Sequence, residues 1–341
     1  MRKILQPILA VALGLVLGLA ATWLAGENPW HVLVILVRGA FGSREALGMT
    51  LFYSTPLIFT GLSVAVAFHA GLFNIGAEGQ LTLGALAAAA VGAVWSGLPW
   101  PVAPALAGAA AVLAGTIWGV IPGWLRARRG SHEVINTIML NLIASGLAGY
   151  VTLYLLKNPD SQNPETRPIG AGYAIHQFRT FGEAHVSTAL PLALFVSALV
   201  WVLLWRTALG FEIRAVGQSE SAARAAGIDV GKIRIIALAT AGGLAGLVGV
   251  GEVLGNAGKF VMEFSPGYGF LGIAVALLGR NQPVGIVAAA LLFGALHKGT
   301  RDLDLETEHI TNELSLVLQA LIILSVSAEG LWSWMKRRSP T

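Results

Sequence analysis

Polar residues that could bind a small solute interrupt an otherwise apolar part of the sequence. The segment 68–80 reads FHAGLFNIGAEGQ and carries two amides and a carboxylate, at Asn74, Glu78 and Gln80. Lipid cannot solvate such groups. The segment is therefore either a turn outside a membrane or a break between helices whose polar groups face a cavity or another helix.

A second polar group opens the predicted helix at about 133–156. It consists of Glu133, Asn136, Thr137 and Asn141. Glu133 and Thr137 are four residues apart and share one helix face, with the two amides close to it. Two interpretations stay open for these side chains, namely hydrogen bonds between helices and the lining of a solute pathway.

Motifs for catalysis or metal binding are absent from the sequence. The nearest candidate for a phosphate-binding loop, Gly258-Lys259, lacks the upstream glycine and is followed by Phe260. The seven histidines show no metal-ligand spacing, and the absence of cysteine excludes thiolate sites and disulfides. We therefore predict no catalytic residue, no metal site and no cofactor in this chain.

The composition points to the bilayer. Apolar residues make up 55% of the 341 residues and charged residues 12%, with a mean hydropathy of +0.71, whereas soluble domains carry roughly 25% charged residues. The lysines and arginines fall between apolar segments and form no long basic patch, so we expect membrane lipid and no nucleic acid as a partner.

The hydropathy pattern predicts an all-α, polytopic transmembrane helical bundle that forms a single domain over residues 1–341. About 20 residues are needed for each span. The eighth of ten segments is short and bounded by glycines and Pro283, which predicts a half-helix or re-entrant element. The predicted segments are about 4–25, 51–70, 78–96, 102–125, 133–156, 187–206, 233–250, 268–279, 283–298 and 313–331.

Charge distribution predicts the orientation. With both termini in the cytoplasm, most of the 22 lysines and arginines lie in inner connections, as the positive-inside rule requires. The long connection at about 157–186 is then external and the one at about 207–232 internal. The internal one carries a predicted short helix capped by Ser219 and ended by Gly227.

Glycines spaced four residues apart predict close packing of helices. Gly115, Gly119 and Gly123 form one such series, and Gly242 and Gly246 another. In lipid this spacing lets helix backbones approach each other closely.

Five blocks of sequence together resemble the permeases of bacterial nucleoside importers, which depend on a solute-binding lipoprotein. These permeases belong to the ribose and branched-chain amino-acid permease group of ATP-binding-cassette (ABC) transporters. The resemblance covers nearly the whole chain in the same order, with a departure at Arg280, where the family often has glycine. The blocks are GLFNIGAEGQ (71–80), HEVINTIMLN (132–141), GFEIRAVG (210–217), AARAAGI (222–228) and GYGFLGIAVALLG (267–279).

The resemblance implies a permease subunit in the bacterial cytoplasmic membrane. Its implied partners are a second permease (a paralogue or another copy), a cytoplasmic ABC ATPase that binds ATP and Mg²⁺, and an external solute-binding lipoprotein. Nucleosides are the favoured solute, with ribose-like sugars or another small polar solute as the alternative. An ion-coupled secondary transporter is disfavoured because most acidic residues lie near helix ends or in loops.

The resemblance also implies which residues act. The internal connection would dock on the ATPase, with coupling residues Glu212, Arg214, Gly217, Ala223, Ala226 and Gly227. Solute-pathway candidates combine polar groups for ribose and base edges with aromatic rings for stacking. These candidates are Phe73, Asn74, Glu78, Gln80, Glu133, Asn136, Asn141, Tyr268 and Phe270.

Overall fold

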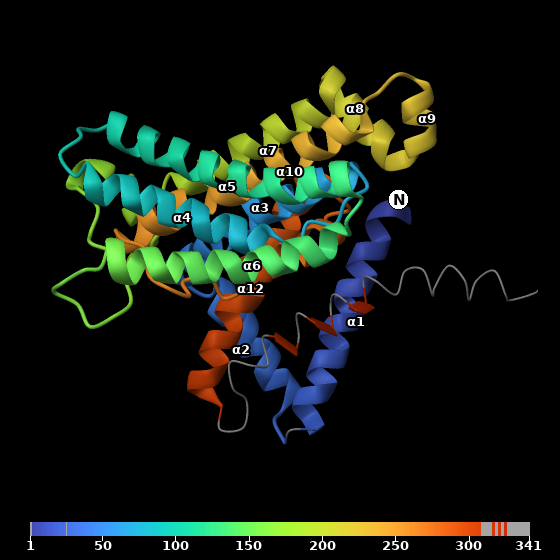
Figure 1. The fold of residues 1–341 in the computed structure, drawn as a ribbon. Coiled ribbons are helices and arrows are strands. Elements are labelled where there is room, and N and C mark those ends of the chain that lie inside the picture. Colours follow the sequence, from blue (N-terminus) through green and yellow to red (C-terminus); the bar gives the residue numbers. More distant parts are fainter. Residues whose placement is uncertain (1, 25, 308–315, 318–319, 322–323, 326–341) are drawn as a thin grey trace, which may run out of the picture.

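The computed structural model describes residues 2–24, 26–307, 316–317, 320–321 and 324–325, and its architecture is helical throughout these residues (Figure 1). The α-helices are α1 (Arg2–Leu24), α2 (Pro29–Phe41), α3 (Arg44–His69), α4 (Ala77–Val94), α5 (Val102–Arg129), α6 (Glu133–Tyr150), α7 (Ala189–Arg206), α8 (Ala208–Gln218), α9 (Glu220–Ala225), α10 (Val230–Gly246), α11 (Tyr268–Leu278) and α12 (Pro283–Glu306). Short π-helical stretches, Val151–Leu155 and Val250–Ala257, extend α6 and α10.

The prediction of a polytopic helical membrane protein is confirmed. Among the described residues, seven helices are long and apolar enough to cross a membrane, and three apolar helices are shorter. Nine of the ten predicted segments have a helical counterpart. The tenth, 313–331, lies mostly outside the described residues.

Two helices, α2 and α8, were missed by the sequence analysis. The helix α2 has 13 residues, too few for a search based on full-length spans. It begins with Pro29, and the side chain of Asn28 caps it by accepting a hydrogen bond from the Trp30 amide at 2.9 Å. It packs beside α3 and α12. A proline at the first helical position after a capping asparagine was the local signal.

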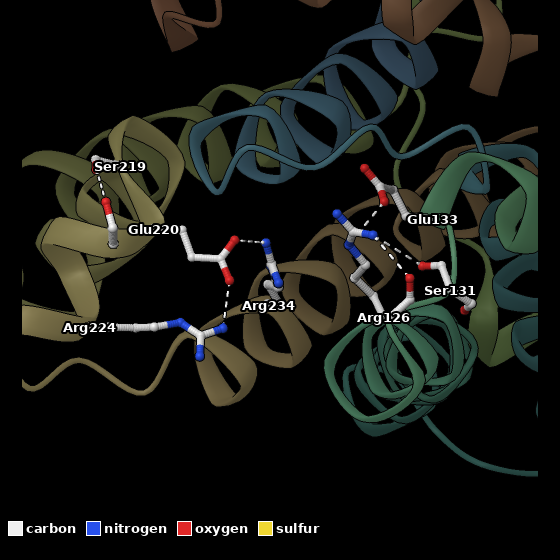
Figure 2. Close-up of polar contacts among 9 residues, drawn as sticks. Arg126, Ser131, Glu133, Ser219, Glu220, Arg224 and Arg234 are labelled. Atoms are coloured by element: carbon white, nitrogen blue, oxygen red, sulfur yellow. Dashed lines mark hydrogen bonds and ion pairs between the residues drawn. The ribbon is translucent and has the colours of Figure 1, made fainter.

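The helices α4, α5, α6, α7 and α10 run between two ends of the bundle, whereas α1, α2 and α12 extend away from them (Figure 1). We call the end that carries α8 and α9 the α9 end, and the end that carries residues 157–186 the loop end. The loop end also holds the start of α3, where Gly48 meets Ala184, and the end of α4, where the Gly170 amide bonds the Gly92 carbonyl at 3.1 Å. The turn from α5 into α6 lies near α9 (Figure 2).

The eighth predicted segment crosses between the ends in two parts. Residues 258–267 first run beside the 157–186 loop, held by hydrogen bonds from the Thr166 amide to the Phe260 carbonyl and from the Met262 amide to the Pro164 carbonyl. The half-helix α11 completes the crossing, and just beyond it the Asn281 carbonyl meets the His69 ring at 3.0 Å. The glycine and proline pattern therefore located a broken span.

The glycine spacing marks a backbone contact between α5 and α10. A Cβ atom at Gly115 would lie 2.2 Å from the Gly242 carbonyl oxygen, and one at Gly242 would lie 2.1 Å from the Gly115 oxygen. Gly119 and Gly246 meet the opposite backbone in the same way. The predicted packing role of these glycines is confirmed, and the two helices are held as one dense unit.

An ion pair fastens the 157–186 loop to the stretch 258–267. The Glu165 carboxylate is 3% exposed and lies 2.8 Å from Lys259 Nζ. The hydrogen bond from Lys259, more than that from Ser161, holds the pKa of Glu165 below its ordinary value. Because the folded-state pKa is depressed, this stabilisation is present above the unfolded pKa and is lost as pH falls through the folded value.

Replacing Lys259 by glutamine is expected to loosen this attachment by about 1.5 kcal/mol at neutral pH, the lower range for a hydrogen bond to a charged group. Limited proteolysis within residues 157–186 at pH 7 and at pH 4 measures the effect. We expect faster cleavage of the variant at pH 7 and a smaller difference from wild type at pH 4. Lys157→Gln, at an exposed position of the same loop, is the control. Equal cleavage of the two variants at pH 7 would contradict the prediction.

Candidate functional site

A cavity of about 150 Å³ lies between α4, α6 and the stretch 260–265. Two carboxylates and one side-chain amide line it, together with hydroxyls and aromatic rings. Its lining comprises Glu78, Gly79, Thr82, Asn141, Ser145, Ala148, Phe260, Met262, Glu263, Phe264 and Ser265.

The cavity lies near the middle of the membrane span. The α6 helix and its extension cross as Glu133–Leu155, and the cavity contacts this span from Asn141 to Ala148. Ser145 and Glu263 are exposed at the mouth of the cavity. Because lipid does not solvate a carboxylate at this depth, the mouth must face a water-filled pathway or another protein subunit.

Glu78 joins this cavity to the half-helix α11. Its Oε2 atom accepts a hydrogen bond of 2.7 Å from the Gly269 amide, in the first turn of α11. Ser265 caps the same helix by accepting from the Tyr268 amide at 2.9 Å. A carboxylate beside a helix N-terminus is favoured by the helix dipole, so Glu78 fixes where the broken span resumes.

Asn141 holds the break between α3 and α4 against α6. Its amide nitrogen donates to the Ile75 carbonyl at 3.0 Å, and its oxygen accepts from the Gly79 amide at 2.9 Å. One side chain thus satisfies two backbone groups freed by the break. Among the predicted pathway residues, the structure brings Glu78 and Asn141 together at the cavity.

Asn74 and Gln80 lie in the neighbouring core and bond to each other. Their amide groups form hydrogen bonds of 2.9 and 3.3 Å, and Asn74 also reaches Ser63. Both side chains are buried. Their hydrogen bonds hold the break between α3 and α4 in shape, outside the cavity lining.

The other two predicted polar residues lie in the first turn of α6, which begins at Glu133 near the α9 end (Figure 2). Glu133 lies 3.3 Å from Arg126 Nε at the end of α5. Asn136 donates to the Ser131 hydroxyl at 2.6 Å. Both precede the cavity along α6 and close the turn between two helices.

The predicted aromatic residues also lie outside the cavity lining. Phe73 packs edge-on against Phe68, with ring centroids 5.0 Å apart, Tyr268 is buried, and Phe270 is 49% exposed. The lining aromatics are Phe260 and Phe264, which the sequence analysis missed. Their position in the stretch that leads to a half-helix was the signal that could have indicated them.

Missed polar lining residues include Thr82, Ser145 and Glu263. Glu263 adopts a left-handed backbone with φ 58°, a conformation that non-glycine residues rarely take. A single hydroxyl in an apolar helix gives no signal of its own in a sequence. No group of three or more His, Asp or Glu side chains suited to a metal ion occurs in the part of the chain that the structure describes.

The predicted coupling residues lie on and around α8 and α9. Gly217, Ala226 and Gly227 are exposed, whereas Ala223 is buried against the bundle. Glu212 is half-buried, and the half-buried Arg214 donates to the Gly210 carbonyl of its own helix at 3.3 Å.

Gly217 also packs against the turn after α3. A Cβ there would approach the His69 carbonyl oxygen to 2.1 Å. The segment that contains α8 is thus seated directly on the turn that precedes the break before α4.

A charged node that the sequence analysis did not single out ties α9 to α10 (Figure 2). Glu220 Oε1 lies 2.6 Å from Arg224 in α9, and its Oε2 lies 2.7 Å from Arg234 in α10. The hydrogen bond from Arg224, followed by the charge of Arg234, holds the pKa of Glu220 below its ordinary value. The predicted Ser219 cap is present, with the Ala222 amide 3.3 Å from the Ser219 hydroxyl.

Residues 46–327 match the protein family described as branched-chain amino acid transport system / permease component. The chain is 36% identical to the guanosine ABC transporter permease protein NupP of Bacillus subtilis, with 95% of this chain and 93% of that protein covered. It is 34% identical to the glucose ABC transporter permease protein TsgB13 of Haloferax volcanii, over 93% and 85% of the two chains.

Lactococcus lactis has two similar proteins. The chain is 35% identical to its nucleoside ABC transporter permease protein NupB, over 96% of this chain and 92% of that protein. It is 28% identical to the nucleoside ABC transporter permease protein NupC, over 72% and 78%.

Proposed function

The chain belongs to the family of branched-chain amino acid transport permease components, and from this premise we propose that it conducts nucleosides. It is a membrane-spanning subunit of an ABC importer and has no ATPase domain of its own. The observation that carries the proposal is the cavity at mid-span, where Glu78 and Asn141 lie among apolar and aromatic side chains. Carboxylates and amides suit the hydroxyls of ribose and the edges of a base, and aromatic rings suit its faces.

The cavity forms one wall of the pathway in this proposal. Its open side, at Ser145 and Glu263, faces a second permease, a paralogue by analogy with the pair of permeases in Lactococcus lactis. The two chains together enclose the solute. Glu78 and Asn141 contact the solute, while the buried Asn74 and Gln80 support the break beside them.

The remaining assembly follows from the two ends of the bundle. The α9 end lies in the cytoplasm, where a separate ATPase binds ATP and Mg²⁺ and docks on α8 and α9. The loop end faces outward and receives solute from a binding lipoprotein. We propose that both termini are cytoplasmic, with ten spans in a bacterial cytoplasmic membrane, and the basic residues near α9 support this orientation.

Nucleoside uptake tests the proposal directly. Cells with and without the chain are given radiolabelled guanosine, adenosine, uridine, ribose or glucose. We expect uptake of at least one nucleoside to depend on the chain and unlabelled nucleosides to compete about tenfold better than either sugar, a difference near 1.4 kcal/mol. Chain-dependent uptake of ribose or glucose alone would favour the sugar alternative, to which the Haloferax relative points.

A further inference from the structure

The short helix α9 has two kinds of attachment to the bundle. Of its six residues, Ala223 is buried among apolar side chains and Glu220 carries ion pairs, while the other four are exposed. The exposed Ser221, Ala222 and Ala225 are available to an ATPase, whereas the Arg224 side chain pairs with Glu220 of its own helix. A movement of α9 would therefore reach the rest of the bundle through Ala223 and Glu220.

The Glu220 carboxylate forms two ion pairs, called here its two arms: a local one within α9 and one between helices. The local arm reaches Arg224, whose side chain is 66% exposed, within the same helix turn. The other arm reaches Arg234 in α10, whose side chain is 16% exposed. An exposed pair within one helix contributes little, whereas the pair with the mostly buried Arg234 joins two helices and so links the position of α9 to that of α10.

Contact continues from α10 to the cavity. The glycine faces bring α10 and α5 into backbone contact, so these helices move as a unit. At the α9 end of α5, Arg126 meets Glu133 at the start of α6, and its guanidinium also donates to the Gly130 carbonyl at 3.4 Å. The helix α6 then carries Asn141 to the cavity wall.

We infer that the Glu220–Arg234 and Arg126–Glu133 ion pairs are two joints through which movement of an ATPase docked at α9 reaches the solute cavity (Figure 2). The inference rests on the proposed function, because it assigns a role within the coupled importer. Arg234 and Glu133 are positioning residues in this scheme: they act by holding helices in register and do not touch solute.

The two arms of Glu220 provide a matched test. Arg234→Gln and Arg224→Gln each remove one guanidinium group that pairs with Glu220. Arg234 pairs with it between helices, and Arg224 pairs with it within one helix. The variants are studied in the complete importer, reconstituted with its ATPase and second permease. Three quantities are measured: the amount of ATPase that copurifies, the rate of ATP hydrolysis, and the solute taken up per ATP consumed.

We expect Arg234→Gln to keep the copurified ATPase and to lower uptake per ATP about tenfold, equivalent to about 1.4 kcal/mol of coupling. Glu133→Gln is expected to act in the same direction. Arg224→Gln is expected to stay within about twofold of wild type, as for an exposed pair within one helix. Equal effects of Arg224→Gln and Arg234→Gln would overturn the inference, as would parallel loss of ATPase binding and uptake.

Restoring the contact between α9 and α10 with a cross-link distinguishes a coupling role of the Glu220–Arg234 pair from a general structural role. Because the chain has no cysteine, Glu220→Cys with Arg234→Cys places two unique thiols at the joint, and a short bifunctional thiol reagent can link them. We expect the unlinked pair to be uncoupled and the linked pair to recover at least about half of the wild-type uptake per ATP, since the link restores the helix contact. An unlinked pair as active as wild type, or a linked pair that stays uncoupled, would reject the joint.

This test is separate from the solute assignment. If the importer carries a sugar instead of a nucleoside, uptake per ATP is measured with that sugar and the comparison of the two arginines is unchanged. A wild-type importer that takes up none of the five solutes refutes the proposed function. The ATP hydrolysis rate of the assembled complex then still reports on the joints, because we expect Arg234→Gln to shift it and Arg224→Gln to leave it unchanged.

Discussion

Replacing Glu78 by glutamine is expected to lower nucleoside uptake by about tenfold to a hundredfold without loss of the folded importer. A charged hydrogen bond to a solute hydroxyl contributes about 1.5 to 3 kcal/mol, and this charge is what the variant removes. Glutamine keeps a side-chain oxygen that can accept from the Gly269 amide, so the start of α11 stays in place. Transport assays alongside thermal unfolding of the purified chain measure both effects.

A three-member series distinguishes solute contact from support. Glu78→Ala removes both the charge and the anchor of α11, so we expect loss of uptake together with lower stability. Asn74→Ala breaks the buried amide pair next to the cavity, so we expect lower stability with unchanged apparent affinity in the protein that remains folded. If Glu78→Gln keeps wild-type uptake and affinity, Glu78 has only the anchoring role.

The fold was largely predictable because lipid imposes one simple rule on the chain. Long apolar segments must form helices, and those were found. The broken eighth span was also indicated, since Gly267, Gly279 and Pro283 leave too short an apolar run. The α2 helix was missed because it is shorter than a full span and its position is fixed by packing beside α3 and α12, which hydropathy does not encode.

The site was only partly predictable. Polar residue types at membrane depth drew attention to Glu78 and Asn141, but also to Asn74 and Gln80, which satisfy each other. Spacing along one helix could not separate these cases. The cavity depends on three segments meeting in space, so the role of Ser145 is visible only in the folded chain, whereas Phe260 and Phe264 stand in the stretch before the half-helix.

The charged node of Glu220, Arg224 and Arg234 was not predicted from the sequence, for a related reason. An acidic residue at the start of a short helix is explained locally by the helix dipole and by a partner four residues later. The second partner of Glu220, Arg234, lies fourteen residues away in another helix. Only the turn between α9 and α10 brings Glu220 and Arg234 together. The helix dipole and Arg224 are therefore enough to account for Glu220 from the sequence alone, and its contact with α10 was missed.

Replacing Gly115 by valine is expected to prevent stable folding of the bundle. The new Cβ would sit 2.2 Å from the Gly242 carbonyl oxygen, 3.0 Å from its carbon and 3.2 Å from Gly246 Cα. All three are backbone atoms in α10, so no side chain can turn aside and the helices must separate. In a bilayer, packing itself drives helix association, so we expect a loss of at least about 3 kcal/mol.

Gly146→Val on α6 is the matched control for this substitution, because a Cβ at Gly146 meets nothing within 4 Å. Both variants add the same isopropyl group to a membrane helix, so they differ only in what surrounds it. We expect Gly115→Val to show little folded protein in detergent and a lower unfolding temperature, and Gly146→Val to behave as wild type. Since α5 and α10 also connect the α9 end to the cavity wall, Gly115→Ala is expected to give a smaller loss of stability together with a lower uptake per ATP. Equal stability of the two valine variants would mean that α5 and α10 can separate without cost, which would remove the rigid connection that the two ion-pair joints require.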